Sequence, residues 1–125
     1  MKIEIANGEI VDRVTILEIK LQKVKAADKL VNITAEYDVL LPAMHEIGIT
    51  AKSTVYQELL KTNNALWEIE DKLRVKEAAK AFDNEFIQLA RSVYYQNDIR
   101  AALKKQINIA TGSKIVEEKD YVKYQ

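Results

Sequence analysis

The chain has 125 residues, of which 48% are hydrophobic and 30% are charged, a composition typical of one globular domain over residues 1–125. Its 19 basic residues equal its 19 acidic residues, so it lacks the positive charge that nucleic-acid and anionic-membrane binders use. With no cysteine, one histidine and three glycines, it cannot build a disulfide framework, a thiolate metal site or a glycine-rich phosphate loop.

Neither a targeting signal nor a membrane-spanning segment is expected. The N-terminal residues carry acids within their apolar stretch, and later apolar runs are too short to cross a bilayer. Together with the lack of cysteine, this favours a cytoplasmic protein that does not insert into membranes.

The N-terminal region combines a short strand pattern with a first helix. Polar and apolar residues alternate over residues 2–6, until an Asn-Gly dipeptide marks a turn. A helix over about residues 9–27 is then predicted by a heptad stripe of apolar residues: Ile10, Val14, Leu17, Leu21 and Val24. Ile16 and Ile19 lie on its opposite side, so this helix is either central in a bundle or shared with a second subunit. The second possibility favours a homodimer.

Two further helices follow, separated by the few residues that interrupt helices. One covers about residues 34–47 and is ended by Gly48. Pro42 lies inside it and cannot donate a backbone hydrogen bond, so we expect a kink or two short helices. The next helix covers about residues 54–82 and again has apolar residues at heptad spacing.

A fourth helix and a mixed tail complete the chain. Asp83 is the expected N-cap of a helix that runs to about residue 110, and Gly112 is its expected stop. Residues 114–125 either pair as a strand with residues 2–6 or form a peripheral arm. The predicted fold is an all-α, up-and-down bundle of about four helices.

Polar side chains interrupt the expected core on two helices. On the third helix a stripe beside the apolar face contains amide, aromatic and charged residues: Asn63, Trp67, Glu70, Asp71 and Arg74. On the fourth helix Asn97 and Arg100 interrupt the apolar arc, and Lys104 continues the same side. These eight residues are the candidate ligand-binding set, with no catalytic residue assigned.

Arg100 needs a carboxylate partner, because an unpaired buried guanidinium is strongly destabilising. Glu70 and Asp71 are the first candidates, and Asp12 is another. One interpretation of this polar layer is an ion-pair and amide network that fixes helix register. The other is a pocket between helices, in which Arg100 and Lys104 attract an anionic small molecule such as a sugar nucleotide while the aromatic and amide groups orient it.

Acidic pairs suggest an alternative function. Glu9 with Asp12, and Glu68 with Asp71, place carboxylates one helical turn apart, and two such pairs facing each other could hold Mg²⁺. All-α nucleotide pyrophosphohydrolases use acids in this way, but their Glu-Glu-x-x-Glu run is absent here. We therefore expect no metal and no other cofactor, and keep a magnesium-dependent pyrophosphohydrolase as the alternative to a non-catalytic binding module.

Three stretches resemble an uncharacterised bacterial family of small all-helical domains of unknown function. They are GEIVDRVTILEIK at residues 8–20, LWEIEDKLR at residues 66–74, and the region 90–108 with its ARSVY, NDIRA and IN segments. Arg13 stands where the family pattern has Lys. Since members are found beside or fused to glycosyltransferases, the resemblance implies a cytoplasmic accessory or ligand-binding role in glycan or lipopolysaccharide synthesis, with a glycosyltransferase as partner. It supplies no catalytic residues.

Overall fold

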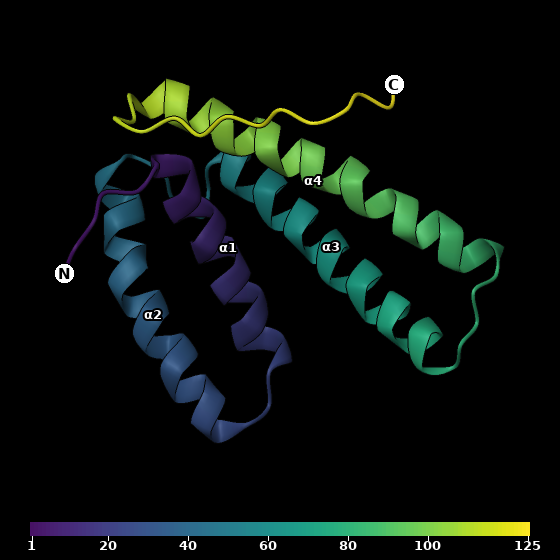
Figure 1. The fold of residues 1–125 in the computed structure, drawn as a ribbon. Helices are drawn as coiled ribbons and strands as arrows, with labels where there is room; N and C mark the ends of the chain where they lie inside the picture. Colours follow the sequence, from purple (N-terminus) through teal and green to yellow (C-terminus); the bar gives the residue numbers. More distant parts are fainter.

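The computed structural model describes residues 1–125 and contains four α-helices that run alternately up and down (Figure 1). Their bounds are α1 Asn7–Lys23, α2 Ala27–Glu46, α3 Thr54–Ala78 and α4 Asn84–Thr111. This confirms the expected all-α fold. The strand pair considered for residues 2–6 and the tail does not form, and both segments lack regular secondary structure. None of the four helices combines the length and apolar character that crossing a membrane requires.

The first hairpin departs most from the predicted boundaries. α1 ends at Lys23 and α2 begins at Ala27, so α2 starts earlier than residue 34, where sequence analysis placed it. No glycine or proline interrupts this region, and Asp28 in the first turn is favourable toward the helix dipole. Pro42 stays inside one helix and does not divide it into two short ones. Its missing N–H removes one hydrogen bond, which the flanking turns tolerate.

α1 is the central helix. It packs against α2, α3 and α4, whereas the α2 backbone lies next to α1 alone. Both of its apolar sides are covered, because Leu17 on one side and Ile19 on the other are at most 2% exposed. The structure therefore selects the central position for this two-sided helix, and its sequence pattern no longer argues for a second subunit.

The core lies at the end of the bundle where all four helices meet. Seven buried side chains from the four helices form it: Val11, Val14, Met44, Tyr56, Leu59, Leu103 and Ile107. At the opposite end the α1–α2 and α3–α4 hairpins diverge (Figure 1). The two hairpins are thus held together mainly by the contacts at the core end.

The first turn of α1 is fastened to the last turns of α4. The Gly8 backbone N–H donates to Asn108 Oδ1 at 2.6 Å, and the Asn7 side-chain amide donates to Thr111 Oγ1 at 2.9 Å. A Cβ atom at Gly8 would lie 2.3 Å from the Lys104 carbonyl oxygen. Glycine is required here because the two backbones approach too closely for any side chain.

α4 ends as the sequence predicts, and the tail then reverses direction. The Asp83 side chain accepts from the Phe86 backbone N–H at the start of α4, and Gly112 closes its end in the left-handed conformation with φ of 66°. Residues 114–125 run back along α4 as an extended arm (Figure 1). Of the two alternatives for the tail, the peripheral arm is confirmed.

Candidate functional site

A buried carboxylate organises the polar layer between α1, α3 and α4. Asp12 is fully buried and accepts two hydrogen bonds from Arg100, at 2.9 Å from Nε and 2.5 Å from Nη2. Asn63 Nδ2 donates to Asp12 Oδ1 at 2.9 Å and to Thr15 Oγ1 at 2.8 Å. We call these four residues the Asp12 network. No buried side-chain nitrogen or oxygen in the structure lacks a partner, so the network is fully satisfied.

The partner of Arg100 differs from the first expectation. Asp12 takes both of its hydrogen bonds, and these raise the pKa of Arg100 against the opposing effect of partial burial. Glu70 adds only a longer-range attraction and forms an exposed pair with Arg74 on its own helix, at 3.9 Å. Asp71 is also exposed. The expected Arg100 pairing with Glu70 or Asp71 is therefore wrong, because α4 directs this guanidinium toward the central helix.

Lys104 forms a second ion pair one turn further along α4. Its Nζ lies 2.7 Å from Glu9 Oε2, while Arg13 Nε lies 2.9 Å from Glu9 Oε1. Partial burial acts to raise the pKa of Glu9, but the hydrogen bonds from these two cations outweigh it and the pKa is lowered. Lys104 also lies 3.6 Å from Glu117 of the tail. It thus joins α1, α4 and the tail.

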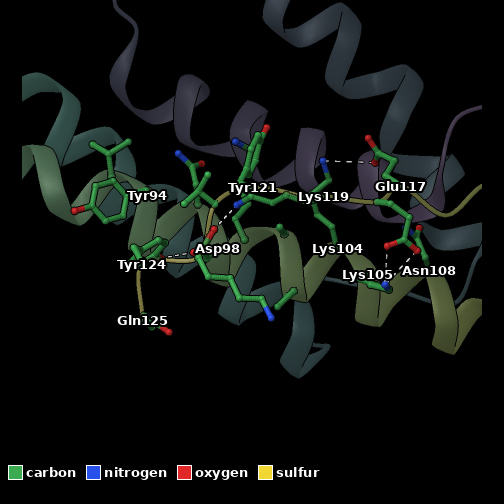
Figure 2. A pocket seen from close by; sticks show the side chains of 18 residues that line it. Tyr94, Asp98, Lys104, Lys105, Asn108, Glu117, Lys119, Tyr121, Tyr124 and Gln125 are labelled. Atoms are coloured by element: carbon green, nitrogen blue, oxygen red, sulfur yellow. Dashed lines mark hydrogen bonds and ion pairs between the residues drawn. The ribbon is translucent and has the colours of Figure 1, made fainter.

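A cleft of about 1250 Å³ lies between α4 and the tail (Figure 2). Asn97, Arg100 and Lys104 line it from α4, beside the buried Asn108. Its charged lining contains five cations and three acids: Arg100, Lys104, Lys105, Lys119, Lys123, Asp98, Glu117 and Glu118. We call this space the tail cleft. Two of these five cations, Arg100 and Lys104, are paired with Asp12 and Glu9 of α1, which lie outside the lining.

A second, smaller cavity of about 250 Å³ also contacts Arg100. Its charged lining is balanced, with three cations and three acids: Arg13, Lys20, Arg100, Glu9, Asp12 and Glu36. Because this cavity is much smaller than the tail cleft, the tail cleft is the stronger candidate.

Exposed polar contacts hold the tail over the cleft (Figure 2). Glu118 accepts hydrogen bonds from Lys105 at 3.0 and 3.1 Å, and Asp98 accepts from Lys119 and Tyr124. The hydrogen bond from Lys119, followed by that from Tyr124, lowers the pKa of Asp98. The same contact with Asp98 raises the pKa of Tyr124 to about 12. Paired charges at the surface therefore contribute to the attachment of the tail.

The two predicted acid pairs do not come together. Asp12 is bound by Arg100, while Glu68 lies on the surface 2.7 Å from Lys23, whose hydrogen bond lowers the pKa of Glu68. The structure contains no group of three or more histidine or acidic side chains placed to hold a metal ion. Three of the four acids that suggested a magnesium site, Glu9, Asp12 and Glu68, thus lie in separate ion pairs, and Asp71 is exposed.

The model of a family described as a family of unknown function, DUF6165, matches residues 1–124 of the chain. The chain belongs to the DUF6165 family. No curated protein and no solved structure matches it. The matched region includes both the Asp12 network and nearly all of the tail, so both lie within the DUF6165 domain.

The structure of this DUF6165 member divides the eight predicted site residues into four groups, with Arg100 belonging to two of them. Asn63 and Arg100 meet at Asp12, and Asn97, Arg100 and Lys104 share the tail cleft. Trp67 is half-buried. The remaining three lie exposed on α3: Glu70, Asp71 and Arg74.

The contribution of the tail to this DUF6165 site was not predicted from the sequence. The acids Glu117 and Glu118 lie opposite the adjacent bases Lys104 and Lys105, beyond a glycine that reverses the chain. The sequence does contain a signal for this contact, since a basic dipeptide before Gly112 and an acidic dipeptide after it can pair when the chain reverses. Asp98 and Tyr124 gave no comparable pattern, because their contact depends on how far the tail runs back along α4.

Proposed function

We propose that this protein is a non-catalytic binding module that holds an anionic small molecule in the tail cleft. The observation that carries the proposal is the gathering of five cationic side chains around one cleft in a chain of zero net charge. Arg100 lines this cleft, and its two hydrogen bonds to Asp12 fix the orientation of its guanidinium. A preoriented guanidinium beside an ammonium group suits a phosphate or carboxylate.

The carboxylates of the tail mark where anionic groups of a ligand would lie. Glu117 and Glu118 face Lys104 and Lys105, and both acids are more than half exposed. Exposed pairs of this kind contribute about 0–1 kcal/mol each, so a ligand displaces them at little cost. The tyrosines that line the cleft, Tyr94, Tyr121 and Tyr124, offer ring faces to a base or sugar.

A nucleotide sugar or phosphorylated sugar is the ligand class that fits this combination of phosphate-binding and stacking groups. The resemblance to domains found beside glycosyltransferases supports the same class. In this proposal the protein is a cytoplasmic accessory of glycan or lipopolysaccharide synthesis, and it presents the bound sugar to a glycosyltransferase partner.

Calorimetric titration with nucleotide sugars and sugar phosphates tests the proposal. We expect saturable binding that Lys104→Gln weakens about tenfold or more, since hydrogen bonds to charged groups contribute about 1.5–3 kcal/mol. Glu117→Gln removes a competing carboxylate and should tighten binding. Lys114→Gln is the matched control, because Lys114 lies in the tail but is 83% exposed and outside the cleft.

Two outcomes contradict the proposal. One is the absence of saturable binding for every anionic sugar ligand tested. The other is an equal effect of the Lys104 and Lys114 variants, with thermal stability measured in parallel because Lys104 also pairs with Glu9. Magnesium-dependent release of pyrophosphate from nucleotides, abolished by Asp71→Asn, would replace the proposal with the hydrolase alternative.

A further inference from the structure

Most contacts that hold the tail lie at the surface; the exception is Glu117, which lies 3.6 Å from Lys104, a side chain only 18% exposed. Asp98 and Lys105 on α4 contact Lys119, Tyr124 and Glu118 of the tail. The side chains of Tyr121 and Val122 between them are 75% and 92% exposed. No apolar side chain of the tail enters the core. The tail can therefore leave α4 without opening the bundle.

The charges on the two segments are complementary in antiparallel order. Along α4 an acid at Asp98 precedes a base at Lys105, and along the tail an acid at Glu118 precedes a base at Lys119. Acids thus face bases at both positions when the two segments run in opposite directions. Any chain with the sequence of this tail fits the same face of α4, and a second copy of the protein provides one.

Tyrosines gather where the tail meets α4. Four of the six tyrosines of the chain lie there, each at least 37% exposed: Tyr94, Tyr95, Tyr121 and Tyr124. The Tyr124 ring lies 4.7 Å from that of Tyr94 and 5.0 Å from that of Tyr95, between centroids. Exposed tyrosine clusters with paired charges around them are typical of protein–protein interfaces.

The connection to the tail allows an exchange between copies. Ser113 is fixed by the Asn7 backbone N–H, whereas Lys114, the next residue, makes only an exposed contact with Glu4 at 3.6 Å. A hinge just after Ser113 would leave the bundle and its fastening intact. Exchange of identical segments is a low-cost route to dimers, because the partner remakes each contact that is released.

We infer that two copies of this chain exchange residues 114–125, so that each tail lies on α4 of the other copy. In this dimer the tail of one copy completes the tail cleft of the other. The three tail residues Lys119, Tyr121 and Lys123 of each lining then come from the other copy. This inference gives the expected homodimer a specific interface. It does not rest on the proposed ligand, because it concerns the protein alone.

Two complementary charge-reversal variants test the exchange. The first variant carries Asp98→Lys and Lys105→Glu on α4, and the second carries Glu118→Lys and Lys119→Asp in the tail. Each variant alone has mismatched charges both within one copy and between two copies. In a mixture, both tails match α4 of the other chain. Sedimentation velocity should show monomers for each variant alone and a heterodimer for the mixture.

A chain with all four substitutions is the matched control, and it should dimerise like the wild type with rising concentration. A mixture that stays monomeric overturns the inference. So does a dimer that each variant forms as readily as the wild type, because it must then use another surface. Circular dichroism of each variant verifies that the helices remain formed.

A second test avoids charge reversal. The chain has no cysteine, so a Lys105→Cys chain mixed with a Glu118→Cys chain can form a mixed disulfide only between copies. We expect this heterodimer on non-reducing gels well above the share that random pairing of the two thiols gives, which is about half of the disulfide-linked dimers. That random share, or no heterodimer, would contradict exchange. Both tests use the protein without ligand, so their failure would leave the proposed binding function standing.

Discussion

Asp12 and Asp98 each bind cationic or polar partners around α4, but they do so in different surroundings. Asp12 is fully buried and held by Arg100 and Asn63, whereas the Asp98 side chain is 42% exposed and held by the tail. Removing one partner of a buried ion pair leaves an uncompensated charge, while water replaces the partner of an exposed one. The same chemistry therefore fixes the helices at one site and permits movement at the other.

The largest effect is expected where the buried pair is broken. Arg100→Ala leaves the Asp12 carboxylate without its cation, which lowers the free energy of unfolding by about 3–5 kcal/mol, toward the lower value because Arg100 is partly exposed. Urea denaturation measures this loss. Arg74→Ala is the control, since Arg74 is 76% exposed and should change stability by less than about 0.5 kcal/mol. Similar urea midpoints for the two variants would contradict the larger stabilising role assigned to Arg100.

A smaller loss is expected at the backbone contact beside the network. Gly8→Ala places a Cβ atom against the Lys104 carbonyl oxygen and should lower the free energy of unfolding by about 1–3 kcal/mol. Helix propensity alone predicts the opposite sign, a gain of up to about 1 kcal/mol. The direction of the change in urea denaturation thus decides whether close packing or propensity dominates at this position.

Substitution of the exposed aspartate should release the tail without unfolding the bundle. Asp98→Asn weakens the contacts with Lys119 and Tyr124, so chymotrypsin should cleave after Tyr121 severalfold faster while the thermal midpoint stays unchanged. Asp38→Asn on the exposed face of α2 is the matched control and should leave cleavage unchanged. Equal cleavage rates would show that Asp98 does not hold the tail.

Acid should produce the smallest and most local change. Because Lys119 and Tyr124 lower the pKa of Asp98, the contact is fully present above the ordinary pKa of aspartate and is lost as pH falls through the lowered value. Amide resonances of residues 117–125 should then shift toward disordered positions. In Asp98→Asn this shift should already be present at neutral pH. Tail resonances that keep their positions until the helices unfold would contradict this assignment.

Periodicity and capping predicted most of the fold, since both are local properties. The Asp83 cap, the Gly112 stop and the two-sided α1 follow from residues close together in sequence. The start of α2 could not be predicted in this way, because no residue between Ala27 and Thr34 either requires or forbids a helix.

The candidate site was predicted only in part. Helical spacing placed Asn63, Asn97 and Arg100 on inward or flanking faces, but it could not say which helix faces which. The choice of Asp12 over Glu70 depends on the central position of α1, a property of the assembled bundle. The tail contacts were missed for the same reason, as they depend on where the chain turns back.

The fastening of α1 to α4 has a consequence for biosynthesis. Its hydrogen bonds join residues 100 to 106 positions apart, so the first helix leaves the ribosome long before its partners in the last one exist. Until Arg100 and Asn108 have been synthesised, Asp12 lacks its cationic partner and the apolar sides of α1 are only partly covered. Contacts of such long sequence separation slow folding. The apolar surface of α1 is therefore exposed during most of translation and is prone to aggregation, so ribosome-associated chaperones are suited to protect it.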